Sequence, residues 1–91
     1  MPRFMIERAL PSIGIASPEE LKAAAIRSNE VLAELAPDIQ WIESYVATDK
    51  TFCIYIATDE ATIRKHAELS GFPATTITEI SKVIDPTTAE S

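Results

Sequence analysis

The stretch WIESYV at residues 41–46, followed by FCIYI at residues 52–56, decides the fold because it predicts a β-hairpin. Both segments are rich in aromatic and β-branched residues, and their side chains alternate between two faces. One face is expected to pack against helices, and it carries Ile42, Val46, Phe52, Ile54 and Ile56. The other face carries Trp41, Glu43, Tyr45, Cys53 and Tyr55. Its aromatic residues are not expected to remain in contact with water, so another surface should cover them.

The loop between the two segments sets which residues pair. Two apolar half-strands face the same side only if the loop holds an odd number of residues, so we expect a three-residue loop at 48–50. In that register Tyr45 lies opposite Cys53, and Glu43 lies opposite Tyr55.

Two helices are expected, each with recognisable end signals. The motif SPEE at residues 17–20 contains a capping box with proline at the first helical position, and it predicts a helix that ends before Pro37. A second, shorter helix is expected over residues 60–70, and Gly71 suits the left-handed position that ends it.

Strands at residues 4–8 and 77–84 complete the order βαββαβ. This order predicts an α+β, ferredoxin-like fold with a four-stranded antiparallel sheet and both helices on one face. We expect residues 1–91 to form a single domain whose last segment, 85–91, is a tail. The uncovered sheet face would be an apolar patch of the kind that soluble proteins reserve for partners, so we expect a homodimer that forms a dimeric α+β barrel.

Composition narrows the classes of function. The chain has a net charge of −6 and no cluster of Lys or Arg, which argues against nucleic-acid binding. It shows no apolar segment typical of a signal peptide or membrane span, so we expect a cytoplasmic protein without membrane contact. Its single cysteine, Cys53, excludes an intramolecular disulfide and a cysteine-pair metal motif.

Several segments together resemble a small bacterial family known as a domain of unknown function: MPRFMIER at 1–8, IQWIESYV at 39–46, FCIY at 52–55, HA at 66–67, GFPA at 71–74 and VIDP at 83–86. One member of that family is described as a nickel-binding protein. The resemblance implies a ferredoxin-like, dimeric protein with nickel or another divalent transition metal as its cofactor; no organic cofactor is indicated. The family often has Gln or His at the position of Glu43, so this chain lacks an imidazole there.

His66 is the first candidate for chemistry, because it is the single histidine. It shares a helix face with apolar residues, and we expect it to approach a pocket between helix and sheet. The other pocket candidates are Phe72, Trp41, Tyr45 and Tyr55. The alternative is a structural histidine that is hydrogen-bonded near the end of its helix.

A second candidate site lies on the uncovered sheet face, where strand alternation is expected to gather Glu7, Glu43 and Cys53. Nickel accepts mixed nitrogen, oxygen and sulfur donors, so these residues and His66 are the metal candidates. The alternative is that Cys53 and the aromatic residues only pack a dimer interface, while the glutamates bond to tyrosine hydroxyls or to Arg3 and Arg8. The two candidate sites lie on opposite sides of the sheet and are rivals.

Three functions are consistent with these features. The first is a homodimeric binding module for nickel or another transition metal, which the resemblance favours. The second is a small cofactor-independent enzyme, of the oxygenase or isomerase type found among dimeric α+β barrels, with its pocket near His66. The third is a dimer with a purely structural or protein-interaction role.

Overall fold

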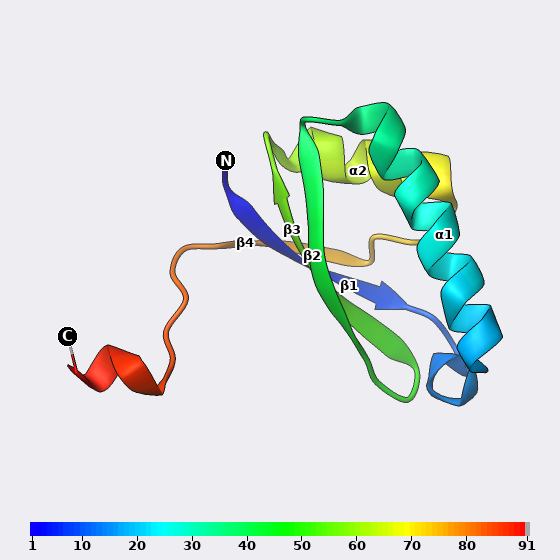
Figure 1. Cartoon of the computed structure of the whole chain (residues 1–91), viewed down its shortest axis with the longest axis horizontal. Helices are drawn as coiled ribbons and strands as arrows, with labels where there is room; N and C mark the ends of the chain where they lie inside the picture. Colours follow the sequence, from blue (N-terminus) through cyan, green and yellow to red (C-terminus); the bar gives the residue numbers. More distant parts are fainter. Residues whose placement is uncertain (91) are drawn as a thin grey trace.

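The computed structural model describes residues 1–90, and its sheet has the strand order β2-β3-β1-β4 with antiparallel neighbours (Figure 1). The strands are β1 (Arg3–Ala9), β2 (Ile39–Val46), β3 (Lys50–Ala57) and β4 (Thr76–Ile80). The helices are α1 (Pro18–Leu35) and α2 (Glu60–Ser70), with short 3-10 segments η1 (Ile13–Ile15) and η2 (Pro86–Glu90). The predicted ferredoxin-like arrangement is confirmed.

The predicted helix signals are also confirmed. The backbone N–H of Glu20 donates to Ser17 Oγ (3.1 Å), and the backbone N–H of Ser17 donates to Glu20 Oε1 (3.0 Å), so α1 begins with a capping box. Asp59 caps α2 by accepting from the N–H of Thr62 at 2.9 Å. Gly71 ends α2 with φ of 81°, a left-handed conformation that glycine adopts without steric cost.

Both helices contribute to a core on one face of the sheet, which we call the covered face. Its central cluster joins residues of β1, β2, β3 and α2: Phe4, Ile6, Ile39, Cys53, Tyr55, Ala57 and Ile63. Leu32 and Leu35 of α1 pack against this cluster. Burial therefore concentrates under α2 and the C-terminal half of α1.

The hairpin differs from the prediction in its loop. The N–H of Ala47 donates to the carbonyl of Lys50 (2.9 Å), so residues 48–49 form a two-residue turn where three loop residues were expected. A β-bulge between Trp41 and Glu43 places one extra residue in β2, so the side chains of Trp41 and Glu43 lie on opposite faces of the sheet. The predicted loop length was wrong because the apolar residues of the two strands do not share one face: Val46 lies on the face of Thr51 and Cys53, opposite to that of Phe52.

The predicted face assignment is consequently wrong for most of the hairpin. The observed opposite pairs are Trp41 with Tyr55, Glu43 with Ile54, and Tyr45 with Phe52. Trp41, Cys53 and Tyr55 therefore belong to the covered face. The three apolar residues of β3 expected beneath the helices, Phe52, Ile54 and Ile56, lie on the other face. The register with β1 decides this, because Phe4 and Ile6 are core residues and lie opposite Tyr55 and Cys53.

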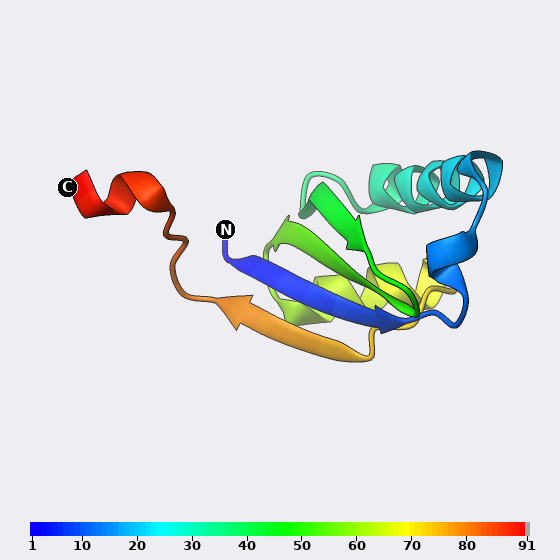
Figure 2. The ribbon, with the colours of Figure 1, turned by 90° about the horizontal axis from the view of Figure 1, so that it is seen from below.

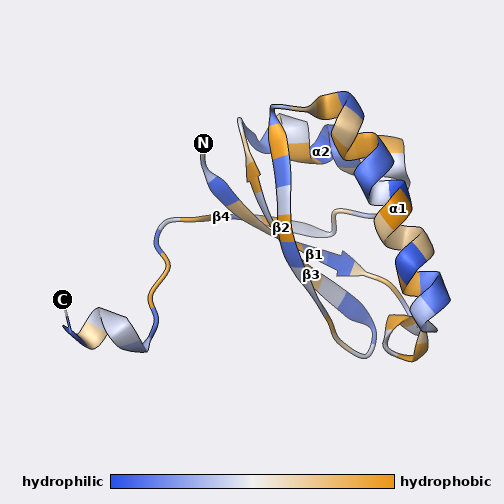
Figure 3. Ribbon diagram, in the orientation of Figure 1, coloured by the Kyte–Doolittle hydropathy of each residue, from blue (hydrophilic) through white to orange (hydrophobic). Residues whose placement is uncertain are grey.

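Within residues 1–90, no helix covers the second face of the sheet, which we call the open face. Its half-buried apolar residues are Met5, Phe52, Ile54 and Ile56, and its polar residues include Glu7, Glu43 and Tyr45. Figure 3 marks the apolar positions of these strands in orange. An uncovered apolar face is thus present as expected, although other side chains compose it.

The last strand is shorter than predicted. β4 ends at Ile80, and the following Val83 and Ile84 are 70% and 77% exposed. In Figures 1 and 2 the chain after β4 runs away from the sheet and ends in η2. Ser91, the end of the predicted tail, lies outside the described residues. Within residues 1–90, neither helix has the length and apolar character needed to cross a membrane.

Candidate functional site

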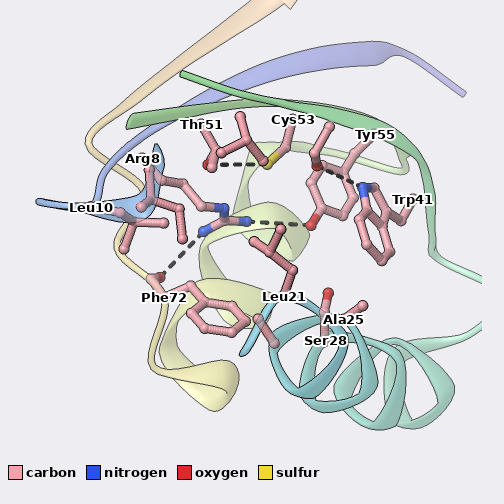
Figure 4. Close-up of a pocket in the computed structure, with 14 residues that line it drawn as sticks. Arg8, Leu10, Leu21, Ala25, Ser28, Trp41, Thr51, Cys53, Tyr55 and Phe72 are labelled. Atoms are coloured by element: carbon pink, nitrogen blue, oxygen red, sulfur yellow. Dashed lines mark hydrogen bonds between the residues drawn. The ribbon is translucent and has the colours of Figure 1, made fainter. Parts of the chain in front are cut away.

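A pocket of about 240 Å³ lies between the N-terminal half of α1 and the covered face (Figure 4). The residues of α1 that line it are Leu21, Ala24, Ala25 and Ser28. They recur at helical spacing on one side of α1, and three of them are small. Because small side chains do not fill the space between helix and sheet, the pocket remains open beneath this half of α1.

Arg8 supplies the charge of this pocket. It is 3% exposed, and its Nη1 donates to the carbonyls of Pro73 (2.9 Å) and Phe72 (3.3 Å). Its Nη2 lies 3.5 Å from the Tyr55 hydroxyl oxygen, which accepts a long hydrogen bond. Figure 4 shows the side chain between Tyr55 and Phe72. Arg8 was predicted only as a partner for glutamates, although it follows Phe4 and Ile6 at a spacing of two residues and so shares their buried face.

His66 lies behind the wall of the pocket and does not line it. The ring is 0% exposed; its Nε2 lies 3.1 Å from Ser28 Oγ, and its centroid lies 5.4 Å from that of Tyr55. Nδ1 has no hydrogen-bond partner among the described residues. Burial, assisted by the Arg8 charge, lowers the pKa of His66 to about 4, while hydrogen bonding to the backbone of Ser28 opposes this shift. The imidazole is therefore neutral near pH 7.

The other pocket candidates are divided between the two faces. Phe72, Trp41 and Tyr55 line the pocket, whereas Tyr45 lies on the open face. Burial raises the pKa of Tyr55 and outweighs the opposing effect of the Arg8 charge, so its hydroxyl stays protonated. Trp41 donates from Nε1 to Ser44 Oγ (2.9 Å), which fixes the indole at the edge of the pocket.

The metal candidates are divided in the same way. Cys53 is buried on the covered face, with Sγ 3.6 Å from Thr51 Oγ1, so the expected grouping of Cys53 and Tyr55 with the glutamates is wrong. Glu7 and Glu43 share the open face. Across residues 1–90 no group of three or more His, Cys, Asp or Glu side chains is placed to hold a metal ion. Within the described residues, the four metal candidates are therefore not gathered in one site.

Both open-face glutamates have neighbours of their own. The Tyr45 hydroxyl donates to Glu43 Oε2, and this carboxylate raises the pKa of Tyr45. Glu7 Oε1 lies 4.0 Å from Lys50 Nζ, at the limit of an ion pair. A tyrosine hydroxyl therefore accompanies Glu43, as the alternative interpretation expected, while Arg8 lies on the opposite face.

Comparisons with known proteins identify relatives. A family model described as "Nickel responsive protein SCO4226-like" matches residues 4–80. Among solved structures, the crystal structure of SCO4226 from Streptomyces coelicolor A3(2) aligns with a TM-score of 0.71 and 20% sequence identity. The alignment covers 90% of this chain and 99% of that chain, and it supports the fold described above. A comparison with curated proteins finds no match.

Proposed function

Because the chain belongs to the SCO4226-like family of nickel responsive proteins, we propose that it is a cytoplasmic homodimeric module that binds nickel or a related divalent transition metal. The observation that carries the proposal is the open face, where two carboxylates border an apolar surface that no helix covers.

The apolar part of the open face supports the dimer. Met5, Phe52, Ile54 and Ile56 lie on neighbouring strands, and a domain of 91 residues buries a comparatively small fraction of its surface on its own, so pairing would add to its stability. Apolar patches of this kind mark interaction sites in soluble proteins. A second copy of the same face is a self-complementary partner, and pairing the two faces gives the dimeric α+β barrel.

The carboxylates supply the metal donors. Pairing adds the Glu7 and Glu43 of a second copy to those of the first, so the dimer offers oxygen donors that one chain lacks. Nickel binds a given donor set more tightly than manganese, iron or cobalt does. His66 and Cys53 stay on the covered face and do not join this site.

Calorimetric titration of tag-free protein with nickel, combined with sedimentation, tests the proposal. We expect saturable binding by a dimer, and weaker binding in Glu43→Gln and Glu7→Gln. Glu79→Gln, an exposed residue of β4 outside the open face, serves as the matched control and should bind as the native protein does. Nickel binding to a monomer, or unchanged affinity in both open-face variants, would remove these residues as ligands.

The pocket is the observation that favours the second candidate, a cofactor-independent enzyme. Trp41, Tyr55 and Phe72 provide aromatic walls there, as an enzyme of this class would need. His66 reaches such a substrate only if the wall formed by Ser28 and Tyr55 opens. A dimer that binds neither metal nor small molecules would leave the third candidate, a structural or protein-interaction role.

A further inference from the structure

The pocket beneath α1 contains a buried positive charge without a counter-charge, and we infer that it binds a small monocarboxylic acid with an apolar body. In this complex the carboxylate pairs with Arg8, and the body lies between α1 and the sheet. The inference concerns the covered face, so it does not rest on nickel binding or on the dimer.

The buried guanidinium of Arg8 favours an anionic ligand. A guanidinium keeps its charge at every physiological pH, and burying a charge is costly unless it is paired. Within residues 1–90 no carboxylate forms an ion pair with Arg8; its partners are the carbonyls of Phe72 and Pro73 and the Tyr55 hydroxyl. Of the described residues that line the pocket, Arg8 alone is charged. An anionic ligand would neutralise it.

The Arg8 guanidinium and the Tyr55 hydroxyl keep hydrogen-bond donors that a ligand can use. The hydrogen bonds to Phe72, Pro73 and Tyr55 do not use every N–H group of the guanidinium. The Tyr55 hydroxyl accepts from Arg8, so its own hydrogen is available to a ligand oxygen. A planar carboxylate matches the guanidinium fork, whereas a phosphate dianion would need a second cation that the lining lacks.

The remainder of the pocket suits the apolar body of a ligand. Its walls away from Arg8 are mostly apolar, with Leu10, Ile13, Leu21, Trp41, Val46 and Phe72. The volume of about 240 Å³ lies just below the usual range for ligand pockets, about 300–1,000 Å³. These walls suit an unbranched alkyl chain or one aromatic ring, and octanoate is a suitable probe.

Binding of octanoate to the full, metal-free chain tests the inference, with 1-octanol and octylamine as probes of the same chain length. We expect octanoate to bind, and octanol and octylamine to bind at least about tenfold more weakly, because only octanoate carries the counter-charge. Amide chemical shifts should change along α1 and β3, which line the pocket, and not along η2, which does not. Equal affinity for octanoate and octanol would overturn the inference.

Three variants complete the test. Arg8→Met keeps the length of the side chain without its charge, and it should lower octanoate affinity by about tenfold to a hundredfold and leave octanol binding unchanged. Arg64→Met changes an exposed arginine of α2 and should have no effect. Ala25→Leu fills the pocket and keeps Arg8, so it should abolish binding of both octanoate and octanol. This variant tests the inference even if Arg8→Met does not fold. Native octanoate affinity in either Arg8→Met or Ala25→Leu would refute the assignment.

Discussion

Protonation of His66 should destabilise the fold as the pH falls. In the native chain the ring is 0% exposed and its pKa is lowered to about 4, whereas an unfolded histidine titrates near 6.5. Below about pH 6.5 the unfolded chain therefore binds a proton that the native chain excludes, and the free energy of unfolding decreases until the pH reaches about 4. Above about pH 6.5, His66 adds no pH dependence to the free energy of unfolding.

The size of the effect follows from the shift. The difference between the two pKa values corresponds to about 3 kcal/mol, and water that reaches the core on protonation reduces it, so we expect a loss of about 1–3 kcal/mol. Such a loss is a large share of the stability of a small domain. Its physical source is the burial of a cation next to Arg8, with neutral Ser28 as the hydrogen-bond partner of the ring.

Urea denaturation of the native chain and of His66→Gln, between about pH 7.5 and pH 4, measures this contribution. Glutamine can still hydrogen-bond to Ser28 but does not titrate, so acidic groups with lowered pKa values, such as Asp59 and Glu20, cancel in the difference. The protein concentration is held fixed because a dimer has a concentration-dependent stability. If the two stabilities fall in parallel, no proton uptake is linked to His66 and the reasoning is wrong.

Three further expectations concern other parts of the molecule. Ser17→Ala removes the capping hydrogen bond to Glu20 and should lower the free energy of unfolding by about 1 kcal/mol, measured in urea. Gly14→Ala places a Cβ 2.8 Å from the Cα of Thr48, so it should destabilise the fold by about 1–3 kcal/mol; an unchanged melting temperature would contradict this. Ile54→Glu puts a charge in the centre of the open face and should convert a dimer to monomers in sedimentation without loss of helical circular dichroism.

The helix boundaries could be predicted from the sequence because their signals are local. Ser17 and Glu20 are three residues apart, and each bonds to the backbone of the other. Gly71 ends α2 through its own conformational freedom. Neither interaction depends on a distant part of the chain, so short motifs were sufficient to predict where both helices lie.

The faces of the hairpin could not be predicted in the same way. Both faces of β3 are apolar, with Phe52 and Ile54 on one and Cys53 and Tyr55 on the other, so hydropathy does not distinguish them. The bulge in β2 leaves no clear mark in the sequence. Pairing with β1, which is distant along the chain, decides the assignment.

The pocket was only partly predictable. Trp41, Tyr55 and Phe72 were selected as aromatic candidates, and all three line it. Arg8 was missed as a pocket residue because its main partners, the carbonyls of Phe72 and Pro73, belong to a loop more than sixty residues away. Its alternation with the core residues of β1 was the one signal that could have revealed it.

The extra residue in β2 has a consequence for evolution within the family. Before it, successive side chains alternate in one phase; after it, Glu43 and Tyr45 take the phase opposite to that of Trp41. A relative that lost Ile42 would keep these pairs, because Trp41 and Glu43 already lie opposite the successive residues Tyr55 and Ile54 of β3. The loss of one residue between Glu43 and Tyr45 would instead move Glu43 to the covered face. The position of any gap in this strand therefore matters in alignments of relatives, because an error of one position assigns Glu43 and Tyr45 to the wrong face of the sheet.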